Sequence, residues 1–189
     1  MASIADVLAI AAHRDDVEQT CGGTLLRSAA RGLRTAILDL TQGEAGTRGT
    51  AEDRAREAEE AARLLGVSWR RALDLPDGAI ANTLENRTRI VGVLREVRPR
   101  VVILPYWQAR HPDHAIVASL GYEACFLSGL AKAPAVRPAA PSARNIKDLD
   151  ELICRPIARS RLCTRVSTPT YGRALWWTLH RSLSSAMHR

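Results

Sequence analysis

The 189-residue sequence predicts an α/β fold in which a mostly parallel sheet lies between two layers of helices. Short apolar runs bounded by polar residues are typical of strands buried on both faces, and here they alternate with longer helical patterns up to about residue 132. A strand followed by a helix occurs four times in this part of the chain. Such alternation favours parallel strands joined by right-handed crossovers, so we expect a Rossmann-like three-layer fold.

Each expected element has its own signal. The strands are short runs rich in Val, Ile and Leu, and residues 101–104 form the strongest of them. The helices end at residues that commonly terminate helices, at Gly32 and Gly66 and before Pro99. In chain order we expect strands at 7–12, 34–40, 71–75 and 101–104, and helices at 23–31, 51–65, 83–97 and 114–130.

The C-terminal part has a different composition. Residues 133–143 hold three prolines and five alanines, which is typical of a linker. We therefore expect a catalytic Rossmann-like domain over residues 1–132 and a Pro/Ala linker with a basic tail over residues 133–189. Because the tail differs so abruptly, we expect it to be atypical or truncated. A divergent folded half, a truncation and a change of reading frame all stay open.

The net charge of +7 comes entirely from the tail. Residues 1–151 hold 20 acids and 20 Lys and Arg, whereas the last 38 residues hold seven arginines and no acid. Arginines this sparse favour a solvated tail, although Trp176 and Trp177 leave binding to nucleic acid or an acidic membrane as an alternative. No membrane-spanning run, signal peptide or paired cysteine motif is visible, so a cytoplasmic protein without nucleic-acid or membrane partners is expected.

Two clusters of acids and histidines directly follow expected strands. The first is His13-Arg14-Asp15-Asp16 and the second is Arg110-His111-Pro112-Asp113-His114. Because the carboxyl ends of parallel strands meet at one edge of a sheet, both clusters should converge. Histidine nitrogens and a carboxylate oxygen are ligands of catalytic zinc. Solvated loop acids are the alternative, and nucleotide binding after Cys21-Gly22-Gly23 is another, although GxGxxG is not matched.

Five ordered motifs carry a resemblance to a known family. They are residues 11–18 with 21–24, residues 39–41 with 46–50, Leu75-Pro76-Asp77-Gly78, Pro105-Tyr106, and residues 110–114. Together they resemble the LmbE/PIG-L zinc-dependent N-acetylglucosamine deacetylases. Within that family the chain is most similar to the bacillithiol-biosynthesis deacetylases, which act on N-acetylglucosaminyl malate. The resemblance covers roughly residues 4–132.

The resemblance implies one zinc ion per chain, with Fe²⁺ as an alternative metal. Its ligands would be His13, Asp16 and His114. Asp15 would be the general base that takes a proton from the attacking water and delivers one to the leaving amine. His111, if protonated, would stabilise the oxyanion. Asp113 would hold a ring nitrogen of a histidine ligand and set its tautomer.

The resemblance also implies a small-molecule glycoside substrate contacted by Arg54 and Arg110, since forked arginines suit carboxylates. A helix-surface Arg54 paired with a nearby Glu is the alternative. Arg14 departs from the family, which has a small residue or proline there, and we expect its side chain to point outward. A metal-binding but catalytically crippled member and a deacetylase of another N-acetylglucosaminyl conjugate remain alternatives. An unfinished sheet edge leaves homo-oligomers open.

Overall fold

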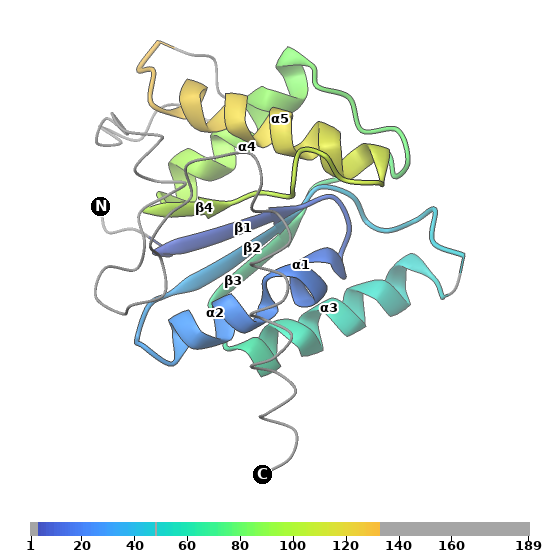
Figure 1. Cartoon of the computed structure of the whole chain (residues 1–189), viewed down its shortest axis with the longest axis vertical. Coiled ribbons are helices and arrows are strands. Elements are labelled where there is room, and N and C mark those ends of the chain that lie inside the picture. Colours follow the sequence, from blue (N-terminus) through green and yellow to red (C-terminus); the bar gives the residue numbers. More distant parts are fainter. Residues whose placement is uncertain (1–3, 48, 133–189) are drawn as a thin grey trace. The chain divides into compact units, whose positions relative to one another are not determined.

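The computed structural model describes residues 4–47 and 49–132. Figure 1 shows a four-stranded sheet with helices α1, α2 and α3 on one face and helices α4 and α5 on the other. The strand order is β3-β2-β1-β4, and every neighbouring pair is parallel. The expected α/β fold with a parallel sheet is therefore confirmed. The linker and basic tail lie outside the described residues.

The strands largely follow the sequence pattern. They are β1 (Val7–Ala11), β2 (Thr35–Asp39), β3 (Trp69–Ala72) and β4 (Val101–Ile103). The strand expected at 71–75 lies at a different position, because β3 begins two residues earlier and ends at Ala72. β3 is the last strand of the described sheet on the β2 side, and all four of its residues are half-buried. Because it contains two arginines, β3 lacks the continuous apolar run of the central strands.

Five helices connect and cover the strands in the described residues. They are α1 (Asp16–Thr20), α2 (Gly22–Ala29), α3 (Ala51–Leu65), α4 (Leu84–Val97) and α5 (Pro112–Ser128). The short helix α1 was not expected from the sequence, and it begins directly inside the first acidic cluster. α3 has the expected bounds because Thr50 and Asp53 form a reciprocal capping box and Gly66 ends the helix with a φ of 67°.

Apolar side chains of the strands alternate between the two faces of the sheet. Leu8, Ile10 and Leu38 belong to the larger cluster, which also contains buried residues of α4 and α5. Ala9 and Ile37 belong to a second cluster that reaches α1 and α2. The alternation follows from the two-residue period of a strand. No helix in the described part of the chain is long and apolar enough to cross a membrane.

Leu38→Ala should destabilise the fold by about 2–5 kcal/mol, because it removes a fully buried side chain from the centre of the sheet. Urea unfolding followed by circular dichroism measures this loss. Leu64→Ala is the matched control, since Leu64 is 64% exposed and the same truncation there should change stability by about 0.5 kcal/mol or less. Equal losses in the two variants would contradict the described core.

Candidate metal centre

Three loops at the carboxyl edge of the sheet supply the candidate metal centre. His13 lies in the loop after β1, Asp77 lies in the turn after β3, and the loop after β4 leads into α5. His111 is the N-cap residue of α5, and Pro112 occupies the first helical turn. The parallel pairing of β1 with β4 therefore brings together two clusters that are about 100 residues apart in sequence.

Three side chains present ligand atoms to one another. His13 Nδ1 lies 3.3 Å from Asp16 Oδ2 and 3.3 Å from His114 Nε2. His114 Nε2 lies 3.0 Å from Asp16 Oδ1. Ligand atoms at 2.0–2.1 Å from a tetrahedral zinc are about 3.3–3.4 Å apart. The donor types and their spacing therefore fit one such ion, and these are the residues that were expected as ligands from the sequence.

The other ring nitrogen of His13 faces two carboxylates. His13 Nε2 lies 3.1 Å from Asp77 Oδ1 and 3.3 Å from Asp113 Oδ2. Asp113 is only 2% exposed, and it accepts a 2.8 Å hydrogen bond from the backbone N–H of Gly78. These carboxylates favour a proton on Nε2, which leaves Nδ1 for a cation. The structure thus places Asp113 against a ring nitrogen of His13.

Asp77 was not assigned a role from the sequence. It lies in the turn Pro76-Asp77-Gly78, and Asp77 Oδ2 also accepts a hydrogen bond from the N–H of Ala45. The motif was recognised as part of the family resemblance, and its place after a strand put it at the same sheet edge. That placement was the available signal, but the contact with His13 depends on how the loops fold.

A second set of side chains could hold a cation. It consists of His13, His111 and Asp113. The ring of His111 lies 4.9 Å from that of His13 and 5.0 Å from that of His114. This set would use the Nε2 of His13 and the Asp113 carboxylate that Gly78 already engages. Since both sets share His13, we take them as alternatives for one ion, and the short mutual distances favour His13, Asp16 and His114.

The carboxylates give the centre the electrostatics of a cation site. The hydrogen bond with Asp16, together with the charges of Asp16 and Asp77, raises the pKa of His13 to about 9 despite its burial. Burial would raise the pKa of Asp16, but its hydrogen bonds with His13 and the charge of His114 lower it overall. A proton on His13 therefore supplies positive charge in the metal-free protein.

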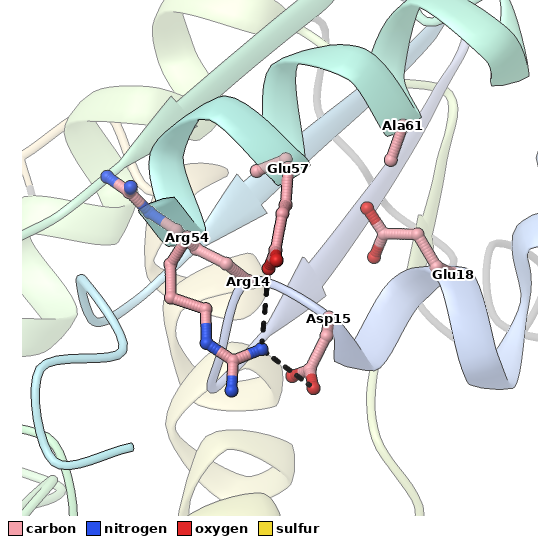
Figure 2. Close-up of a pocket in the computed structure, with 7 residues that line it drawn as sticks. Arg14, Asp15, Glu18, Arg54, Glu57 and Ala61 are labelled. Atoms are coloured by element: carbon pink, nitrogen blue, oxygen red, sulfur yellow. Dashed lines mark ion pairs between the residues drawn. The ribbon is translucent and has the colours of Figure 1, made fainter. Parts of the chain in front are cut away.

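Asp15, the expected general base, lies beside these ligands in sequence but has other partners. Its side chain is 52% exposed, and Oδ2 lies 3.8 Å from Arg54 Nη1 and accepts a 3.2 Å hydrogen bond from Gln19. Figure 2 shows Asp15 and Arg54 facing one another across a pocket, with Glu57 as a second partner of Arg54 at 3.7 Å. Arg54 thus makes the helix-surface pairing that was its alternative, and it also reaches the Asp15 carboxylate.

The pocket has a volume of about 120 Å³, below the roughly 300–1,000 Å³ of typical small-molecule sites. It could therefore accept a small polar group but not a whole glycoside. It is lined by Arg14, Asp15, Glu18, Arg54, Glu57, Ala58 and Ala61.

The other two arginines named from the sequence differ in their surroundings. Arg14 is half-buried, and its guanidinium donates hydrogen bonds to the Gln42 side chain and to the carbonyl of Ala51. Arg14 was expected to point outward into water, but its guanidinium binds protein groups and its side chain lines the same pocket as Asp15 and Arg54. Arg110 is exposed in the loop before α5.

Several known proteins are similar to this chain in sequence. The model of the PIG-L family, described as GlcNAc-PI de-N-acetylase, matches residues 8–125. Diacetylchitobiose deacetylase of Thermococcus kodakarensis is 37% identical over 134 residues, which are 66% of this chain and 50% of the relative. The 1D-myo-inositol 2-acetamido-2-deoxy-alpha-D-glucopyranoside deacetylase of Kineococcus radiotolerans is 32% identical over 151 residues, covering 59% of this chain and 42% of that protein.

Solved structures show the same fold. A conserved protein of Thermus thermophilus has a TM-score of 0.68 and 47% identity, with 71% of this chain and 61% of that chain covered. N,N'-diacetylchitobiose deacetylase of Pyrococcus horikoshii has a TM-score of 0.64 and 30% identity, with 68% and 52% covered. The chain spans about half the length of these named deacetylases. Since the family model matches well over half of the chain, the chain belongs to the PIG-L family.

Proposed function

We propose that the chain is a zinc-dependent N-deacetylase that hydrolyses the acetamide of an N-acetylglucosamine conjugate. The observation that carries the proposal is the set of mutually close ligand atoms on His13, Asp16 and His114, in a chain of the PIG-L family. The named relatives are deacetylases of acetylated amino-sugar compounds, which supports the same substrate class here. Fe²⁺ is the alternative metal.

In the proposed reaction, water adds to the acetamide carbon, the C–N bond breaks, and acetate and a free amine are released. Zinc bound at the centre supplies Lewis acidity, which polarises the carbonyl and lowers the pKa of water. Asp15 accepts a proton from the attacking water and returns one to the leaving amine. For this role the Asp15 carboxylate must come within hydrogen-bond reach of the water. Its side chain is exposed, so no surrounding core side chains prevent it from rotating.

His111 is suited to stabilise the developing oxyanion. Its Nδ1 accepts a 3.3 Å hydrogen bond from the backbone N–H of Asp113, as part of the α5 N-cap. A nitrogen that accepts a hydrogen bond carries no proton, so the proton of neutral His111 is on Nε2. The neutral ring can thus donate from Nε2, so the proposed role does not require His111 to be protonated.

The proposed aglycone is malate, as in N-acetylglucosaminyl malate, the substrate of the bacillithiol-biosynthesis subgroup. Arg54 on the pocket and Arg110 in the exposed loop provide forked donors for its carboxylates. The relatives named for chitobiose and myo-inositol compounds make other N-acetylglucosaminyl conjugates the alternative. Release of free amine from all three substrate types, compared at equal concentration, identifies the preferred aglycone.

A second candidate function is metal binding without turnover. It is favoured by one observation, the contact of Asp15 with Arg54 and Gln19 rather than with the metal ligands. Zinc binding at the centre with no acetate release from any of the three substrates would establish this alternative.

Asp15→Asn should lower the rate of acetate release by about 10²–10⁴-fold, because the amide cannot accept a proton from water. Zinc affinity should stay close to that of the original chain. Glu60→Gln is the control, since this exposed α3 carboxylate pairs only with neighbouring Arg63 in the described contacts. A rate in Asp15→Asn equal to that of the control would remove Asp15 from the mechanism.

His114→Ala should abolish tight zinc binding, whereas His111→Ala should retain it and lose about 10²–10³-fold in rate, as expected for loss of an oxyanion donor. Equilibrium dialysis with metal analysis measures one zinc per chain in the second variant and none in the first. The reverse result would assign the ion to the alternative set of His13, His111 and Asp113.

Zinc binding at pH 7.5 should release about one proton per ion, because the pKa of metal-free His13 is about 9 and zinc displaces its proton. Because zinc displaces this one proton, each unit of increasing pH between about 7 and 9 should strengthen zinc binding by about tenfold. Calorimetry in buffers of different ionisation enthalpy counts the released protons. Binding heats that do not depend on the buffer would show that His13 is already neutral.

A further inference from the structure

Arg70 of β3 has a largely enclosed side chain that the proposed reaction does not use. Its side chain is 10% exposed and lies on the same face of the sheet as α1 and α3. Nε and Nη2 form a forked pair with Asp39 at 2.8 and 3.1 Å, and Nη1 binds Glu18 of α1 at 2.5 Å. Nη1 also donates to the carbonyl of Ala58 in α3 at 3.0 Å. Arg70 therefore joins the end of β2 to two helices.

One further contact connects Arg70 to the metal centre. Its Nη2 donates a hydrogen bond to the backbone carbonyl of Arg14. That carbonyl belongs to the peptide unit between Arg14 and Asp15, with the ligand His13 on one side and the ligand Asp16 on the other. A fixed carbonyl restricts the rotation of this peptide unit, and so it restricts the direction in which the flanking side chains leave the loop.

A second hydrogen bond, within the loop after β1 itself, also restrains the metal ligands. The N–H of His13 donates a 2.9 Å hydrogen bond to Asp16 Oδ2, the carboxylate that faces His13 Nδ1. The loop thus closes on itself on the ligand side, while Arg70 holds it from the sheet side. Ligand atoms must keep their separations within a few tenths of an ångström to bind one ion. A small rotation of the Arg14 carbonyl would therefore lower the metal affinity.

From these contacts we infer that Arg70 is a positioning residue, which fixes the Arg14 carbonyl and thereby holds His13, Asp15 and Asp16 in the geometry that binds the metal. The inference rests on the proposed function, because it assumes that His13 and Asp16 are ligands. It assigns Arg70 an action through the loop and no contact with substrate or metal.

The neighbouring Arg71 provides a matched control. It lies on the same strand, and its guanidinium forms a forked pair with Glu96 of α4 at 2.9 and 2.8 Å. It also lies 4.9 Å from the ring of Trp69. Because successive strand residues point to opposite faces, Arg71 makes a similar ion pair on the face away from the metal loop. Loss of that pair tests what an ion pair contributes to stability alone.

The experiment compares Arg70→Lys with Arg71→Lys in the full chain. Both substitutions keep the positive charge and remove the fork, so both should lower the melting temperature of the metal-free protein. Zinc affinity, measured by competition with a chromophoric chelator, should fall by about 10–100-fold in Arg70→Lys, as is typical when the support of a metal ligand is lost, and should be unchanged in Arg71→Lys. Hydrogen exchange of the His13 amide should become faster only in Arg70→Lys.

Arg70→Met is a second variant, which removes the charge and leaves the buried Asp39 and the half-buried Glu18 without it. If it fails to fold, the lysine variants decide. Zinc affinity and His13 exchange in Arg70→Lys that match those of Arg71→Lys would overturn the positioning role. A chain that binds no zinc would overturn the proposed function instead, and the exchange rates would still test Arg70 in the metal-free protein.

Discussion

The two ring nitrogens of His13 have different partners, and the candidate centre depends on this division. Asp77 and Asp113 face Nε2, whereas Asp16 and His114 face Nδ1. A neutral imidazole carries one proton, so a proton placed on Nε2 by two carboxylates leaves a lone pair on Nδ1. The carboxylates of Asp77 and Asp113 at Nε2 thus leave Nδ1 able to bind a cation. Because Asp113 is itself held by the N–H of Gly78, the turn after β3 takes part in setting this orientation.

The parallel sheet explains why these groups meet. Pairing of β1 with β2 and β4 places the ends of three strands at one edge, and short connections leave little freedom for the side chains that follow them. An ion pair between Asp39, at the end of β2, and Arg70 also supports this geometry. Burial raises the pKa of Asp39 to about 6 even beside that arginine. Without its cation, this carboxylate would be costlier still to keep ionised at the sheet edge.

Local signals explain how much of this could be predicted. The bounds of α3 follow from Thr50, Asp53 and Gly66, and the convergence of the two histidine clusters follows from the strand–helix alternation. The third strand was predicted at 71–75 but lies at 69–72, because a half-buried edge strand with two arginines lacks a continuous apolar run. The roles suggested here for Asp77 and Arg70 could not be read from spacing, since each depends on a long-range contact between loops or strands. Sequence patterns report periodicity and caps, whereas such contacts exist only once the sheet has formed.

The local charge balance separates a functional centre from a merely structural one. Stability alone gives little reason to gather Asp16, Asp77 and Asp113 around one imidazole, because three neighbouring carboxylates repel one another, and all three contacts are with His13, which is only 15% exposed. A single proton on His13 offsets one of these charges, and a divalent cation beside Nδ1 would offset more while leaving Nε2 protonated. The fold itself does not specify the reaction, because one fold can support different chemistries. Support for hydrolysis therefore comes from this cluster of side chains and from the residues that hold its geometry.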